Sequence, residues 1–121
     1  MRKLGIVWGI LFLLGGILGF VPGITEHEMF LGIFMVNTAH GLMHIVSGAI
    51  FLAASSLGAT AARLWFLIFG AFYAVLAVIG FQVGEGMIFR LISNNTYDSW
   101  GHAGLALVLL LIGLVATKQE R

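Results

Sequence analysis

Four long stretches of the chain carry almost no charge, and no other feature limits the fold as strongly. They cover residues 4–21, about 37–56, 63–82 and about 95–117. Each is close in length to the ~20-residue α-helix that crosses the hydrocarbon core of a bilayer. The chain of 121 residues is 60% hydrophobic and 9% charged, whereas soluble proteins are roughly half apolar and a quarter charged. We therefore predict an all-α membrane protein with four transmembrane helices.

The first stretch could also be a signal peptide, but two features favour a helix that is retained. The uncharged run from Leu4 to Val21 is longer than the apolar part of a usual signal peptide, and no small-residue cleavage pattern follows it. Pro22 and Gly23 then stop the helix. With four helices and short connections, residues 1–121 are expected to form a single transmembrane domain.

The two halves of the sequence resemble each other. Leu18-Gly19-Phe20 near the end of the first stretch matches Ile79-Gly80-Phe81 near the end of the third, and Asn-Thr opens both the second and the fourth. When each repeat contains two helices, the second repeat enters the membrane in the same orientation as the first. We expect two pseudo-symmetric helical hairpins, covering residues 1 to about 57 and about 58 to 121, related by an axis along the membrane normal.

The basic residues indicate which side of the membrane each connection faces. Five of the six lie at the termini or between the two halves: Arg2, Lys3, Arg63, Lys118 and Arg121. Because positively charged segments tend to stay in the cytoplasm, we expect both termini there, with the chain crossing the inner or plasma membrane several times. The other two connections then face the extracytoplasmic side, and we interpret their short apolar patches, 29–36 and 87–92, as interfacial loops.

A polar motif opens the second stretch and, in altered form, the fourth. Each copy has an ionisable residue three positions after its first Asn and a histidine four positions further on: Asn37, His40 and His44, then Asn95, Asp98 and His102. An Asn or Thr at this place caps a helix, and residues four apart share one helix face. At 1.5 Å per residue, the ionisable positions lie ~5 and ~10 Å inside the helix start. We expect all four ionisable side chains to converge below the extracytoplasmic surface.

Three interpretations of this cluster stay open. Three histidines and one carboxylate form a nitrogen and oxygen set that suits Zn²⁺ or another divalent metal, and the chain has no cysteine to offer instead. Alternatively, the cluster is metal-free, and its hydrogen bonds hold the helices together in a structural or interaction module. A b-type haem held by His44 and His102, one from each half, is the third interpretation, although it leaves His40 and Asp98 unexplained.

The sequence indicates few other functions. A net charge of +1 provides no basic surface for nucleic acid, so the lipid bilayer is the expected partner. The chain has no phosphate loop, dinucleotide fingerprint or protease signature, and Ser47 has no base beyond the same histidines. These features point away from an enzyme without excluding one. A homo-oligomer or a membrane protein partner stays open.

The chain resembles the small bacterial and archaeal membrane proteins grouped as the domain of unknown function 4383 family. The resemblance covers nearly the whole chain and is carried by two motifs: Asn37-x-x-His40-x-x-x-His44-x-x-x-Gly48 and Asn95-x-x-Asp98-x-x-x-His102. Gly41 stands where an Asn is expected in many relatives, so a hydrogen bond made there would be missing here. The resemblance implies four membrane helices and no established activity.

Overall fold

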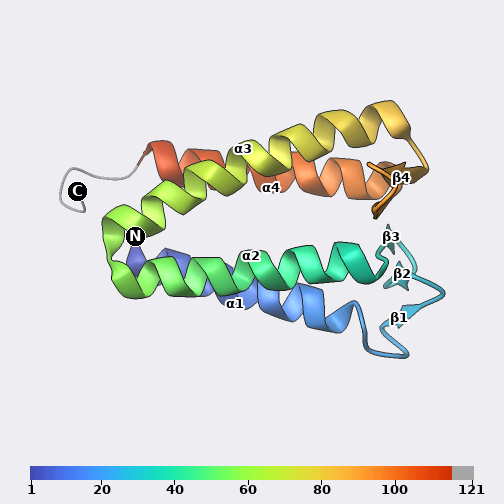
Figure 1. The fold of residues 1–121 in the computed structure, drawn as a ribbon, viewed down its shortest axis with the longest axis horizontal. Helices are drawn as coiled ribbons and strands as arrows, with labels where there is room; N and C mark the ends of the chain where they lie inside the picture. The colour runs from blue at the N-terminus through green and yellow to red at the C-terminus, as the bar shows by residue number, and fades with distance from the viewer. Residues whose placement is uncertain (116–121) are drawn as a thin grey trace.

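Four α-helices dominate the computed structural model, which describes residues 1–115 (Figure 1). The helices are α1 (Arg2–Leu18), α2 (Thr38–Leu57), α3 (Ala59–Val83) and α4 (Thr96–Leu114). The expected end of the last helix near Thr117 lies outside the described residues, as do Lys118 and Arg121.

The helices form two hairpins that lie side by side. α1 packs mainly against α2, and α3 packs mainly against α4, while α2 and α3 provide the largest single share of the contact between the hairpins. Gly58 alone separates α2 from α3, and its φ of 140° lies in a region that residues with a side chain rarely adopt. The N-terminus and this turn lie at one end of the molecule, and all the strands lie at the other (Figure 1).

Short antiparallel strands occupy both connections at the strand end, where the sequence predicts interfacial loops. β1 (Thr25–Glu26), β2 (Met29–Phe30) and β3 (Phe34–Met35) form one sheet, and β4 (Gly86–Ile88) pairs with β5 (Ile92–Asn94). His27 and Glu28 make the turn between β1 and β2 with φ values of 51° and 63°. Turns of this kind usually carry Asn or Gly. Because His27 and Glu28 stand in the β1–β2 turn instead of Asn or Gly, the sequence carries no signal for this hairpin.

Three of the four helices, α2, α3 and α4, are long and apolar enough to cross a membrane. α1 has 17 residues and ends at Leu18, three residues before the predicted end at Val21, because the chain turns at Gly19. A helix of that length spans about 25 Å, somewhat less than the ~30 Å hydrocarbon core. The chain is therefore a mostly helical membrane protein, and a fourth crossing by α1 stays a prediction.

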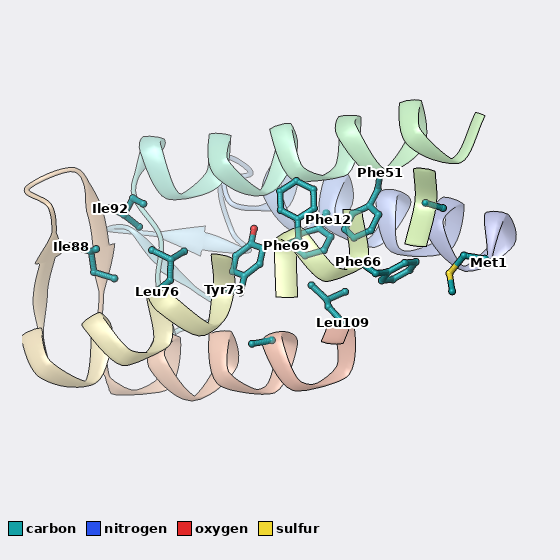
Figure 2. Packing of buried hydrophobic residues seen from close by; sticks show 12 residues of the cluster. Met1, Phe12, Phe51, Phe66, Phe69, Tyr73, Leu76, Ile88, Ile92 and Leu109 are labelled. Carbon is teal, nitrogen blue, oxygen red and sulfur yellow. The ribbon is translucent and has the colours of Figure 1, made fainter. Parts of the chain in front are cut away.

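Aromatic rings fill the centre between the hairpins (Figure 2). The Phe12 ring lies 5.7 Å from that of Phe51 and 5.5 Å from that of Tyr73, measured between ring centroids. Phe66 and Phe69 of α3 also pack against Phe51, at 4.8 and 5.1 Å between ring centroids. This core contains rings from both hairpins, and Tyr73 forms its edge towards the strand end.

The two hairpins are closed by different contacts. In the first, a Cβ atom added at Gly48 of α2 would lie 2.6 Å from the carbonyl oxygen of Gly9 in α1. In the second, a Cβ added at Gly113 of α4 would lie 2.7 Å from the side chain of Leu67 in α3. The first hairpin therefore brings backbone against backbone, whereas the second packs a leucine over a glycine.

Candidate functional site

The starts of α2 and α4 position the functional side chains. Asn37 caps α2, and its side-chain oxygen accepts a hydrogen bond of 2.9 Å from the backbone N–H of His40. Asn95 caps α4, and its oxygen accepts a bond of 2.8 Å from the N–H of Asp98. The prediction of an Asn or Thr cap is confirmed at both helices, with Asn in the role each time.

Three imidazoles converge at the strand end of the helices. His40, His44 and His102 each have a side-chain nitrogen within 4.8 Å of the other two. The ring centroid of His40 is 5.1 Å from that of His44 and 5.2 Å from that of His102, and the last two are 6.0 Å apart. His40 and His102 are buried and His44 is half-buried. Rings from both hairpins thus form one group, the tri-histidine cluster.

Hydrogen bonding leaves most of the nitrogen atoms of this cluster unused. Nδ1 of His40 donates to the backbone carbonyl of Ser93 at 3.0 Å, which leaves Nε2 without a proton. Nδ1 of His102 is buried and has no hydrogen-bond partner. Among residues 1–115, no hydrogen bond joins one imidazole of the cluster to another. The three rings therefore lie close together without hydrogen bonds between them.

Asp98, the fourth residue predicted for the site, is engaged by backbone groups. Its Oδ2 accepts hydrogen bonds of 3.0 Å from the N–H groups of Met35 and Asn95. The second bond completes a capping box at the start of α4. Asp98 lines the same cavity as the three histidines, but it is not part of the group of nitrogens within 4.8 Å. Its role as a metal ligand stays a prediction.

The two hairpins exchange hydrogen bonds at the strand end with matching sequence offsets. Nδ2 of Asn37 donates to the carbonyl of Leu91, four residues before the other cap, at 2.9 Å. Nδ2 of Asn95 donates to the carbonyl of Ile33, four residues before Asn37, also at 2.9 Å. Each helix cap is thus tied to the strand segment of the other hairpin.

Ser93 adds a contact without a counterpart in the first hairpin. Its Oγ accepts a bond of 2.8 Å from the backbone N–H of Asn37 and donates at 3.1 Å to the carbonyl of Met35. This hydroxyl satisfies the cap N–H of α2, a role that Asp98 performs at α4. In the sequence, only the place of Ser93 two residues before Asn95 pointed to this role.

Tyr73 and Ser47 lie beneath the cluster, towards the aromatic core. The Tyr73 ring centroid is 5.4 Å from that of His102 and 5.8 Å from that of His44. Its hydroxyl and Ser47 Oγ are 2.9 Å apart, and Ser47 Oγ donates to the carbonyl of Met43. The position of Ser47, three residues after His44 on the same helix face, indicated this proximity, whereas nothing in the sequence singled out Tyr73.

A cavity of about 240 Å³ adjoins the cluster. Its wall includes the three histidines, Asp98 and several apolar residues from both hairpins: Phe30, Phe34, Val36 and Leu105, with Gly15 and Gly101. In tetrahedral Zn²⁺ sites the ligand nitrogens are ~3.3 Å apart, at Zn–N distances of ~2.0–2.1 Å. Small ring rotations would bring nitrogens now within 4.8 Å to that spacing. The donor set therefore fits a metal ion, with room beside it.

The helices and the buried polar cluster define a small helical membrane protein with a candidate metal site between two hairpins. The family model described as "Domain of unknown function (DUF4383)" matches residues 2–115. The chain therefore belongs to this family, as the two Asn-based motifs predicted. Comparison with the curated proteins and with the solved structures gave no match.

Proposed function

We propose that the chain crosses the membrane four times as two pseudo-symmetric hairpins, with both termini in the cytoplasm. The reciprocal bonds of Asn37 and Asn95, made at the same offsets in each half, support the internal repeat. Arg2, Lys3 and Arg63 lie at the end opposite the strands, which supports the orientation. The tri-histidine cluster then lies just below the extracytoplasmic surface.

We further propose that this cluster binds one divalent metal ion, with Zn²⁺ as the first candidate. The observation that carries the proposal is that three side-chain nitrogens from two hairpins lie within 4.8 Å of each other. The bond from His40 Nδ1 to the Ser93 carbonyl supports it, because histidines that bind metals usually donate their other N–H to a carbonyl or carboxylate. Asp98 stays a candidate fourth ligand.

Three imidazoles leave an open coordination position on a tetrahedral ion. Structural zinc sites have four protein ligands, whereas sites with three keep a position for water or a small ligand. The adjoining cavity of about 240 Å³ would receive that fourth ligand. The cluster therefore suits exchange of a ligand at the metal better than pure reinforcement of the fold, and no reaction is assigned to it.

A metal-free role as a structural module is the second candidate. It is favoured by the bonds that Asp98, Ser93 and the two Asn caps already make between the hairpins. Hydrogen bonds between membrane helices contribute ~1 kcal/mol each. In this reading, the three imidazoles only fill the space beneath those bonds.

Metal content decides between the two candidates. We expect the detergent-purified chain, loaded with zinc and dialysed, to retain about one zinc per chain in elemental analysis. The double variant His44→Ala, His102→Ala should lose it. His27→Ala is the matched control, because His27 is an exposed turn residue outside the cluster. Absence of stoichiometric zinc in the parent, or equal retention in the double variant, would overturn the metal proposal.

Metal removal should also lower thermal stability. We expect a chelator to lower the Tm of the parent and of His27→Ala but to leave the Tm of the double variant unchanged, because binding to the folded state alone stabilises it. A metal-free module predicts instead that the double variant melts lower whether or not a chelator is present. A visible spectrum of protein produced with haem available tests the haem interpretation, and a colourless preparation removes it.

A further inference from the structure

A second cavity of about 190 Å³ extends the space beside the cluster towards the centre of the bundle. It is lined by Trp8, Leu11, Phe12, Gly15, His44 and Leu105. Gly15, His44 and Leu105 also line the first cavity, so the two adjoin. Both lie between α1 and α4, which pack against their hairpin partners and barely touch each other. Together they form one groove, the α1/α4 groove, whose polar end is the histidine cluster.

Gly15 keeps this groove open. A Cβ atom added at Gly15 would meet no atom within 4 Å, whereas one added at Gly9 or Gly16 of the same helix would collide with α2. Gly15 therefore plays no part in helix packing. A glycine in a helix costs up to ~1 kcal/mol relative to alanine, and here the structure gains only empty space from it.

The polar end of the groove has hydrogen-bonding capacity that the protein does not use. His102 is 3% exposed, lines the groove, and has a buried Nδ1 without a partner. His44 lines both cavities and is half-buried. Buried polar atoms are normally paired, and an unpaired one costs ~1–3 kcal/mol. A ligand oxygen in the groove would remove that cost if a rotation of the His102 ring brings Nδ1 to the cavity wall.

The walls of the groove select the kind of ligand. Leu11, Trp8 and Phe12 form an apolar path along α1, while Phe30 and Phe34 line the wider end by the histidines. No Lys or Arg is among the lining residues, and Asp98 is, so a phosphate head group would meet no cation and one carboxyl group. A flat, uncharged head with carbonyl oxygens fits these walls better than a phospholipid head.

We propose that the α1/α4 groove binds a prenylated quinone from the bilayer. The quinone ring occupies the cavity beside Phe34, one carbonyl oxygen accepts a hydrogen bond from His102, and the apolar tail leaves along Trp8 and Leu11. At about 240 and 190 Å³, the two adjoining cavities together fall within the ~300–1,000 Å³ of ordinary small-ligand pockets. Because the hydrogen bond comes from an imidazole, binding does not require a metal in the cluster.

Titration calorimetry of the detergent-purified full chain, treated with chelator, tests the proposal with decylubiquinone as the probe. We expect saturable binding, at least 10-fold weaker in Gly15→Leu, whose side chain would fill the groove. Gly104→Leu is the matched control, because a Cβ there also meets no atom within 4 Å but Gly104 lines neither cavity. Gly15→Ala should fall between the parent and Gly15→Leu. Circular dichroism verifies that each variant is folded.

Zinc stoichiometry separates this proposal from the metal site. Gly15→Leu should keep the zinc content of the parent, since residue 15 is not in the tri-histidine cluster. No saturable quinone binding, or equal affinity in Gly15→Leu and Gly104→Leu, would overturn the quinone proposal and leave the metal proposal standing. Tighter binding of a short-chain phosphatidylglycerol than of the quinone would overturn it in favour of a phospholipid.

Discussion

The starts of α2 and α4 carry the same Asn cap but use the ionisable side chain three residues later in different ways. At α4, the Asp98 carboxylate closes the capping box and binds the N–H of Met35 in the other hairpin. At α2, the Ser93 hydroxyl takes over the cap N–H, and His40 turns its ring towards the other two histidines. In the second hairpin this side chain stabilises the helix ends, and in the first hairpin it provides the extra imidazole.

The two hairpins also differ in how their helices pack against each other. Gly48 brings α2 against the backbone of α1, whereas Gly113 lies under the flexible side chain of Leu67. The first hairpin is therefore closed more rigidly, and it provides two of the three histidines. A rigid support of this kind holds ligand side chains at fixed separations.

The largest expected effect tests the rigidity of the first hairpin. We expect Gly48→Ala to lower the free energy of unfolding by about 3 kcal/mol, because its Cβ would lie 2.6 Å from a backbone oxygen that cannot move aside. Gly113→Ala should cost under about 1 kcal/mol, since Leu67 can change rotamer. Unfolding by sodium dodecyl sulfate in mixed micelles, followed by circular dichroism, measures both. Equal losses would remove the distinction between the hairpins.

The next largest expected effect compares Asp98 with His40, the ionisable residues three positions after the two Asn caps. Asp98→Ala should cost about 2 kcal/mol, because two backbone N–H groups lose their partner at a site where Asp98 is only 3% exposed. His40→Ala removes a single hydrogen bond and should cost about half as much, yet it should lower the zinc content whereas Asp98→Asn should not. The same unfolding titration and elemental analysis apply. If Asp98→Asn also loses zinc, Asp98 is a metal ligand as well as a helix cap.

The smallest expected effect tests Ser93, whose hydroxyl binds the cap N–H of α2 in the way that Asp98 does at α4. Ser93→Ala should cost about 1 kcal/mol, because the N–H of Asn37 and the carbonyl of Met35 lose their partner but belong to half-buried residues near the start of α2. Ser93→Thr keeps the hydroxyl and serves as the control. Amide hydrogen exchange at the start of α2 should be faster in Ser93→Ala and unchanged in Ser93→Thr. Unchanged exchange in both would mean that the cap does not depend on Ser93.

Spacing and hydropathy predicted the helices and the convergence of the histidines. Asn caps and four-residue spacing are local signals, and they placed His40, His44 and His102 correctly at one end of the bundle. The strands were missed because the β1–β2 turn uses His27 and Glu28, and the β4–β5 turn uses Phe89 and Arg90, in a backbone conformation that these residues seldom adopt.

The partners of each polar group could not be predicted from the sequence. The bond from Met35 to Asp98 joins residues 63 positions apart, and its donor is a backbone N–H, which carries no residue-specific signal. The same holds for the bond between His40 and the carbonyl of Ser93. Such contacts depend on the register between the two hairpins, which the packing of α2 against α3 and the contacts of the strand segments set together.

The exchanged cap bonds restrict how the two hairpins can move. Asn37 and Asn95 each reach the opposite strand segment at 2.9 Å, and Met35 reaches Asp98 at 3.0 Å. Sliding one hairpin along the other by a single residue, about 1.5 Å, would distort all of these bonds at once. The exchanged bonds therefore hold the two hairpins in register at the strand end. At the opposite end, Gly58 joins the hairpins directly, so the two hairpins are tied to each other at both ends.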